Sequence, residues 1–154
     1  MSAEECNCIL KEKTSGVLSL YDEKGYTYGV PLNYIREGNR IYFHSATVGH
    51  KIEAAKFHDK VCFTVIAEDT VLPERTSTKY RSVIVFGRIR MAESDEEKTA
   101  VLSAMGKRFS PDRTEHLKNV ISKKLNVTEV MVLEIEHITG KKAIEFLQDN
   151  NREE

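Results

Sequence analysis

The run of residues 40–51, RIYFHSATVGHK, combines the residue types that can hold a phosphate group. It begins with strand-like alternation and continues into the small and hydroxylated residues 45–47. After Gly49, the basic pair His50 and Lys51 opens a predicted helix. The positive end of a helix dipole, its free backbone N–H groups and a lysine all favour a bound anion. We therefore expect an anion site here, although a loop–helix junction without a ligand would show the same pattern.

Two other segments carry residue types that could line a site beside this one. Residues 29–33, GVPLN, place a glycine and a proline within a predicted strand, so that backbone is exposed to a flat ring that could hydrogen-bond to it. Residues 78–83, TKYRSV, alternate hydroxyl groups, cations and an aromatic ring at the start of a strand. Each segment is ordinary alone, but the three in this order form a pattern.

Composition indicates a soluble globular protein, because 40% of the 154 residues are hydrophobic and 31% are charged. We expect a single domain over residues 1–154, with a core at about 14–142 and peripheral ends at 1–13 and 143–154. The net charge of −1 gives no general attraction to nucleic acid or to an anionic membrane. The acidic, polar N-terminus lacks a signal-peptide core, and no apolar run approaches the roughly 20 residues that span a bilayer. We expect a cytoplasmic protein without nucleic-acid or membrane partners.

Alternating hydrophobic residues and turn residues predict about six strands, as in a small antiparallel barrel. Pro31 implies an edge, a bulge or a bend, and Gly87 a bulge or a bend. Residues 68–76 carry a proline and charges and are predicted to form an exposed loop. The predicted strands cover residues 15–21, 26–35, 40–44, 60–67, 78–91 and 129–138.

Helices are predicted for a short N-terminal segment and for residues 49–57, 94–107 and 114–125. Ser94 and Glu97 form a capping-box pattern at the start of one of them. In the helix at 49–57, Ile52, Ala55 and Phe57 are expected on one face. The helix at 114–125 has one apolar face, formed by Leu117, Val120, Ile121 and Leu125.

Cysteines and histidines give no indication of a metal site. Cys6 and Cys8 are closer together than the cysteines of a C-x-x-C motif, and we expect them near a mobile terminus without a function. His44, His50 and His58 lack a nearby acidic or cysteine ligand. We therefore predict no metal.

The chain resembles the pyridoxamine 5′-phosphate oxidase-like family of FMN-binding split barrels, particularly the nitroimidazole-resistance (Nim-type) flavoproteins. The resemblance covers roughly residues 16–142. It implies a mainly β (α+β) fold, an antiparallel six-stranded split β-barrel with a few peripheral helices. Five segments carry it: YGVPLNY at 28–34, IYFHSATVGHK at 41–51, VCFTV at 61–65, YRSVIVFG at 80–87 and ITGKK at 138–142.

The same resemblance implies a homodimer with two flavin sites at its interface, with FMN as the cofactor and FAD as the alternative. It places Gly29, Val30, Pro31, Leu32 and Asn33 along the flavin ring. It places Phe43, His44, Ser45 and Ala46 beside the ring and ribityl chain, and His50 and Lys51 at the phosphate. It places Tyr80, Arg81, Ser82 and Val83 near the ring.

Two positions bear on the chemistry. His50 stands where the oxidases proper usually carry arginine, and since a neutral imidazole binds phosphate more weakly, the choice between FMN and FAD stays open. His44 would lie close to the cofactor and could be catalytic, although a histidine at a strand end is more often structural. The chain lacks a recognisable C-terminal substrate motif of the true oxidases, so we do not expect their reaction.

The leading hypothesis is a flavin-dependent oxidoreductase that reduces a small electron-poor substrate, such as a nitroimidazole or another nitroaromatic, with reduced nicotinamide or another donor. A second hypothesis is a flavin-binding or redox-sensing module without turnover. A third is a split barrel that binds haem through a histidine. The remaining alternative is a structural dimer with an empty pocket.

Overall fold

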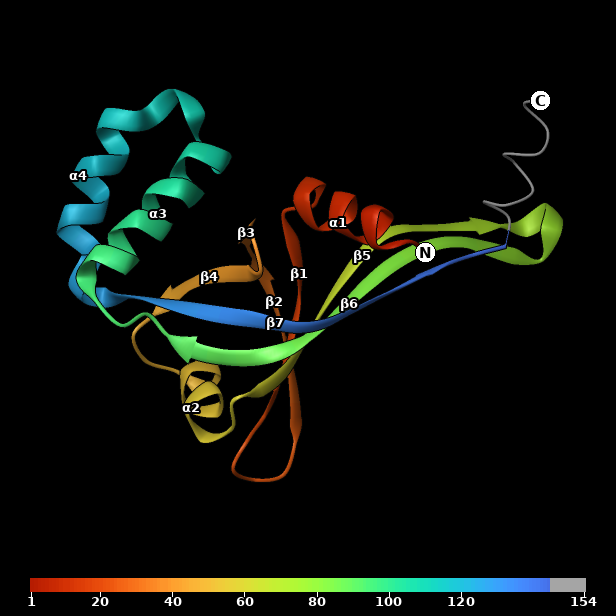
Figure 1. Ribbon diagram of the computed structural model, residues 1–154, viewed down its shortest axis with the longest axis horizontal. Helices are drawn as coiled ribbons and strands as arrows, with labels where there is room; N and C mark the ends of the chain where they lie inside the picture. The colour runs from red at the N-terminus through yellow and green to blue at the C-terminus, as the bar shows by residue number, and fades with distance from the viewer. Residues whose placement is uncertain (145–154) are drawn as a thin grey trace.

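The computed structural model describes residues 1–144, apart from the side chain of Thr114, and these form one seven-stranded antiparallel sheet with four α-helices around it (Figure 1). The strand order is β2-β1-β5-β6-β7-β4-β3. The predicted mainly β, antiparallel class is therefore confirmed. The elements are α1 (Ala3–Glu12), β1 (Ser15–Tyr21), β2 (Thr27–Asn33), β3 (Ile35–Glu37), β4 (Arg40–Ala46), α2 (His50–Phe57), β5 (Lys60–Leu72), β6 (Ser77–Met91), α3 (Asp95–Phe109), α4 (Thr114–Lys124) and β7 (Thr128–Lys142), with three short 3₁₀ turns between them.

The number of strands differs from the predicted six because the strand expected at 26–35 divides at Tyr34. The Tyr34 N–H donates to the carbonyl oxygen of Thr14 at 3.1 Å, and its hydroxyl donates to that of Leu10 at 3.0 Å. These bonds turn the chain from β2, which pairs with β1, into β3, which pairs with β4. Pro31 lies in β2 at the edge of the sheet, where a missing N–H costs no ladder bond.

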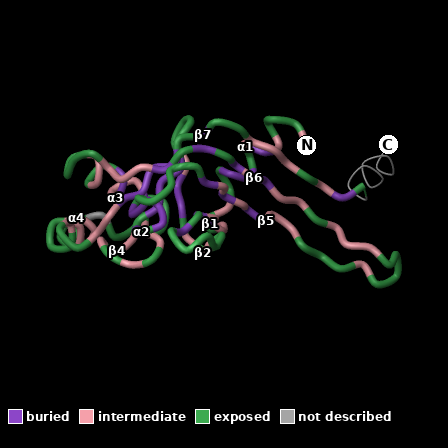
Figure 2. The backbone as a smooth tube through the Cα atoms, turned by 90° about the horizontal axis from the view of Figure 1, so that it is seen from below, coloured by how far each residue is buried: buried purple, intermediate pink, exposed green. Residues whose placement is uncertain are grey.

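The loop predicted at 68–76 is wrong over most of its length. β5 continues to Leu72 and pairs with β6 as far as Ser77, after a bulge between Ile66 and Glu68. Strand-forming residues on both sides of the turn outweigh the charges that suggested a loop. The parts of β5 and β6 near their connecting turn thus form a long hairpin arm that projects away from the rest of the molecule and is mostly exposed or half-buried (Figure 2).

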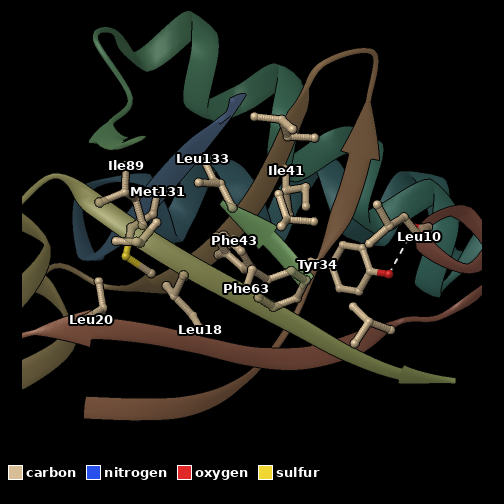
Figure 3. Packing of buried hydrophobic residues seen from close by; sticks show 14 of the residues in the cluster. Leu10, Leu18, Leu20, Tyr34, Ile41, Phe43, Phe63, Ile89, Met131 and Leu133 are labelled. Atoms are coloured by element: carbon tan, nitrogen blue, oxygen red, sulfur yellow. Dashed lines mark hydrogen bonds between the residues drawn. The ribbon is translucent and has the colours of Figure 1, made fainter. Parts of the chain in front are cut away.

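The core lies inside the curved sheet and is organised around aromatic side chains (Figure 3). The ring of Phe63 makes edge-to-face contacts with Tyr34 at 4.9 Å and with Phe43 at 5.0 Å. All three side chains have no exposed surface. A second cluster lies between the sheet and α3, where Tyr42 and Val132 pack with Val101 and Met105.

Helix α1 packs against the core, although residues 1–13 were expected to be a peripheral end. Cys6 is 3% exposed and Leu10 is fully buried, so the expectation of a mobile segment around Cys6 is wrong. Ser2 and Glu5 form a complete capping box, and Glu5 also pairs with Lys142 at 2.7 Å. Sequence gave no sign of this long-range pair, which fastens the helix to β7.

Helix α3 begins where the sequence predicts, with Ser94 accepting from the N–H of Glu97 at 3.2 Å. The carboxylate of Glu97 accepts from the N–H of Glu93 instead of that of Ser94, and it forms two bonds with Arg90 at 2.8 and 3.0 Å. The helix is therefore joined to β6 by a bidentate ion pair. In α2, Ile52 is buried as expected. Phe57 was expected on the same face, and this prediction is wrong because its ring is mostly exposed.

Candidate functional site

Strand β4 supplies the first part of the predicted site and directs alternate side chains to different surroundings. Phe43 points into the core, whereas His44 and Ala46 are exposed. The hydroxyl oxygen of Ser45 is buried and has no hydrogen-bond partner among the described residues. A buried hydroxyl without a partner is costly, but an oxygen with no accessible surface is out of reach of a bound group unless the chain around it moves. Only the main chain of Phe43 could contact a cofactor.

A cavity of about 520 Å³ begins at these β4 residues. Its wall is formed by α3 and α4, which lie as a pair beside the ends of β4 and β7 (Figure 1). The apolar side chains that line it come mainly from these two helices: Leu102, Met105, Phe109, Leu117, Val120 and Ile121. The sequence identified the apolar face of α4 but not the surface that it covers.

The imidazole of His44 lies at the rim of this cavity, where solvent can still reach it. Partial burial lowers the pKa of His44 below its ordinary value of 6.5, because desolvation disfavours the charged ring. A neutral imidazole can accept a hydrogen bond or ligate a metal through one nitrogen, and donate through the other.

The second part of the predicted site is the start of α2. Gly49, the N-cap residue, has φ of 123°, a conformation that favours glycine, and no side chain caps the helix. Lys51 is half-buried in the first turn. An uncapped N-terminus with a lysine beside it attracts an anion.

His50 has partners that the sequence did not predict. Its Nε2 lies 3.3 Å from a carboxylate oxygen of Asp22, which is only 5% exposed. Its ring also lies edge-to-face with that of Tyr28, at 4.5 Å. The start of α2 is therefore held against β2, one residue away from Gly29. Asp22 was predicted only as part of a turn.

Strand β2 presents the predicted ring-binding residues on two faces. Gly29, Pro31 and Asn33 are exposed, whereas Val30 and Leu32 pack against the core. On the exposed face, Gly29 and Pro31 carry no bulky side chain, so a flat ring could approach the backbone at these two residues. Asn33 is already engaged, since its side-chain N–H donates to the carbonyl oxygen of Thr14 at 3.1 Å.

The fourth predicted segment lies on the β5–β6 arm. Val83 is fully buried, so its side chain cannot touch a cofactor. Arg81 pairs with Glu68 at 3.2 Å, and the carbonyl oxygen of Tyr80 accepts from the N–H of Ala143 at 2.9 Å. Within one chain the arm projects away from α2, α3 and α4 (Figures 1 and 2).

The structure thus joins some predicted residues and separates others. His44, Ser45 and Ala46 line one cavity, and His50 contacts β2 through Tyr28. The arm residues 80–83 lie apart from both. Within the described part of the chain, no three His, Cys, Asp or Glu side chains gather closely enough to hold a metal, and no helix is long and apolar enough to cross a membrane.

These features define an open antiparallel split barrel with an anion-attracting strand–helix junction. The family model for pyridoxamine 5′-phosphate oxidase matches residues 2–142. The chain therefore belongs to the pyridoxamine 5′-phosphate oxidase family. Among curated proteins, none matches it significantly.

Three solved structures with the same fold are each less than 25% identical to this chain. The flavocytochrome Anf3 from Azotobacter vinelandii is 24% identical with a TM-score of 0.80, over 92% of this chain and 67% of that one. An FAD and heme binding protein from Mycobacterium smegmatis is 24% identical with a TM-score of 0.78, over 92% and 71%. A candidate 5-nitroimidazole antibiotic resistance protein from Bacteroides thetaiotaomicron is 22% identical with a TM-score of 0.72, over 90% and 82%. They agree on the predicted split-barrel fold, with a sheet that is not closed.

Proposed function

We propose that this protein binds FMN, with FAD as the alternative, and that it is an oxidoreductase that reduces small electron-poor compounds such as nitroimidazoles. Family membership supports a flavin, as do two structural neighbours described as a flavocytochrome and as an FAD and heme binding protein. The neighbour described as a candidate nitroimidazole resistance protein supports the substrate class. A bound flavin would supply two-electron redox chemistry.

The observation that carries the proposal is the junction between β4 and α2. Within three residues of chain it holds an uncapped helix start at Gly49 and the half-buried cation Lys51. Both groups favour a phosphate. The exposed face of β2 beside His50 offers backbone to a flat ring. The residues present therefore fit FMN.

We also propose that the site is completed by a second copy of this chain. The predicted residues 80–83 lie on an arm that points away from β4 and α2 of the same chain, so they can reach a cofactor only on a partner. The outer face of β5 and β6 beside the core, where β5 also pairs with β1, supports this. Its side chains are uncharged and partly apolar where a solvent-facing strand would normally be polar: Cys62, Thr64, Ile66, Ile84 and Phe86. Ile66 is 62% exposed and Phe86 is 42% exposed.

The absorption spectrum tests cofactor binding. The purified protein, or protein reconstituted with FMN, is expected to show flavin bands. Lys51→Ala is expected to weaken FMN binding about tenfold, since a charge-assisted bond contributes about 1.5–3 kcal/mol. The matched control is Lys56→Ala, an exposed lysine of the same helix, which should bind as the wild type does. A colourless protein that takes up neither FMN nor FAD would overturn the proposal.

Turnover is tested separately by following the oxidation of reduced nicotinamide in the presence of 2-methyl-5-nitroimidazole. The FMN-loaded protein is expected to accelerate the reaction over free FMN at the same concentration. Equal rates would instead favour a flavin-binding or redox-sensing module without turnover.

Haem is the second candidate ligand, and one observation favours it. His44 stands at the mouth of an apolar cavity, and its lowered pKa keeps the imidazole neutral and able to ligate iron. A Soret band after addition of haemin, lost in His44→Ala, would support this candidate. Unchanged haemin absorption would exclude it.

A further inference from the structure

The cavity beside β4 is larger and more apolar than a single five-membered ring requires. Its volume of about 520 Å³ falls in the range of roughly 300–1,000 Å³ typical of sites that enclose a drug-sized ligand. Leu102, Phe109, Leu117, Val120 and Ile121 face it from α3 and α4. Burial of a larger ring system against this wall would be favourable in proportion to its apolar area.

Five of the lining residues are polar: His44, Ser45, Ser110, Lys124 and Thr128. The hydroxyl oxygen of Ser45 has no accessible surface, so His44 is the β4 side chain that offers a polar group to a ligand. The charged side chain among the described lining residues is that of Lys124, on an exposed residue at the end of α4. A neutral ligand fits this lining better than a carboxylate or a phosphate, which would find no buried cation there.

The shape of the wall depends on the close contact between α3 and α4. A Cβ atom at Gly106 would lie 2.8 Å from both terminal carbons of Leu117, so the glycine lets α4 approach closely. Gly106 and Leu117 both line the cavity. The wall is thus a packed surface rather than a loose loop, and it can select ligands by size.

We propose that this cavity binds flat, uncharged, fused two-ring compounds that carry a nitro or carbonyl oxygen. The oxygen would accept a hydrogen bond from the imidazole N–H of His44 at the rim, and the rings would lie against Val120 and Ile121. The proposal rests on the proposed function in one respect. If the β4–α2 junction holds a flavin, the cavity shares His44 and Ser45 with that site and is the compartment for the electron acceptor.

The test measures binding by equilibrium dialysis, with 1-nitronaphthalene as the fused-ring probe and 2-methyl-5-nitroimidazole as the single-ring comparison, to protein with and without FMN. The fused-ring probe is expected to bind at least about tenfold more tightly, because it buries more apolar area. Val120→Trp fills the cavity and should weaken the probe by at least about tenfold while FMN affinity stays unchanged. Asn119→Trp, on the exposed side of α4, is the matched control. Ile121→Phe serves if the tryptophan variant does not fold.

Three outcomes would overturn the inference. Displacement of the probe by FMN would mean that the cavity holds the flavin itself. Tighter binding of decanoate than of 1-nitronaphthalene would mean that it takes a fatty chain. Equal binding to wild type and to both cavity-filling variants would place the probe elsewhere. A different result would separate the two proposals. If the protein takes up no flavin but binds the probe in a way that depends on Val120, the proposed function is wrong and the cavity assignment holds.

Discussion

Asp22 determines how much positive charge the β4–α2 junction offers to an anion. Its carboxylate accepts from the N–H groups of Lys24 at 3.0 Å and Tyr26 at 2.8 Å, and it lies 3.3 Å from His50. An anion at the junction would therefore meet a negative charge beside the His50 ring. The net cation of the junction is therefore Lys51, and His50 serves mainly to position the start of α2.

We predict that Asp22→Ala destabilises the protein by about 1–3 kcal/mol, because two N–H groups of the β1–β2 turn and the His50 ring lose a shared acceptor. Urea unfolding followed by circular dichroism measures the change. Glu23→Ala, at an exposed position in the same turn, should change stability little. Similar urea midpoints for Asp22→Ala and Glu23→Ala would show that the stability of the turn does not depend on the Asp22 carboxylate.

His44 gives a prediction about pH. Its folded-state pKa is lowered from 6.5 by desolvation, so the unfolded chain binds the proton more readily. Stability is therefore full above the unfolded pKa and declines as pH falls from about 6.5 through the folded value. NMR titration of the imidazole should give a midpoint below 6.5, and His44→Gln should remove this part of the decline. A midpoint at or above 6.5 would contradict the partial burial.

At the scale of elements, Gly87 carries the bend in β6. The register between β6 and β7 shifts between Phe86 and Gly87, and a Cβ atom at Gly87 would collide with the carbonyl oxygen of Glu134. That oxygen belongs to the backbone of the central strand β7 and cannot move aside. The bulge thus brings two long strands into closer contact than any side chain permits.

Gly87→Ala is accordingly expected to cost about 1–3 kcal/mol, the usual range for overpacking. Gly29→Ala is the comparison, because its Cβ would meet only a side-chain carbon of Val17, at 3.3 Å. Thermal unfolding of both variants measures the difference. Equal melting temperatures for Gly87→Ala and Gly29→Ala would mean that the backbone of β7 at Glu134 can shift to accommodate the added Cβ atom.

Local sequence patterns predicted those elements whose signals are themselves local. The Ser94 cap, the Gly87 bulge and the alternation along β5 and β6 are each decided within a few residues. The break at Tyr34 could not be predicted, because it depends on bonds to Thr14 and Leu10, which only the folded chain brings near.

The candidate site shows the same division. The anion-attracting features around Lys51 could be predicted from neighbouring residues, since helix starts attract anions wherever they occur. The Asp22–His50 pair and the helical wall beside Ser45 join segments that are distant in sequence. No periodicity encodes such contacts, and for that reason the cavity became apparent only in the structure.

At the scale of the whole molecule, the position of the β5–β6 arm links the proposed dimer assembly to the proposed cofactor binding. If arm residues 80–83 contact a flavin held by the β4–α2 junction of another chain, a monomer has only half of each site. We predict that Ile66→Lys combined with Phe86→Lys converts the proposed dimer of 17.6 kDa chains into monomers, because two like charges from each chain would be buried at a symmetric interface. Light scattering after size-exclusion chromatography measures the mass.

The same double variant should lose FMN affinity although its changes lie outside the β4–α2 junction. Tyr26→Lys is the control, since Tyr26 is 71% exposed in the β1–β2 turn, and it should stay dimeric and retain FMN. The melting temperature of the double variant should match that of the wild type. The loss of FMN affinity could then not be explained by unfolding. A monomeric variant with full FMN affinity would show that one chain holds the cofactor alone, and the arm would then serve assembly without contributing to the site.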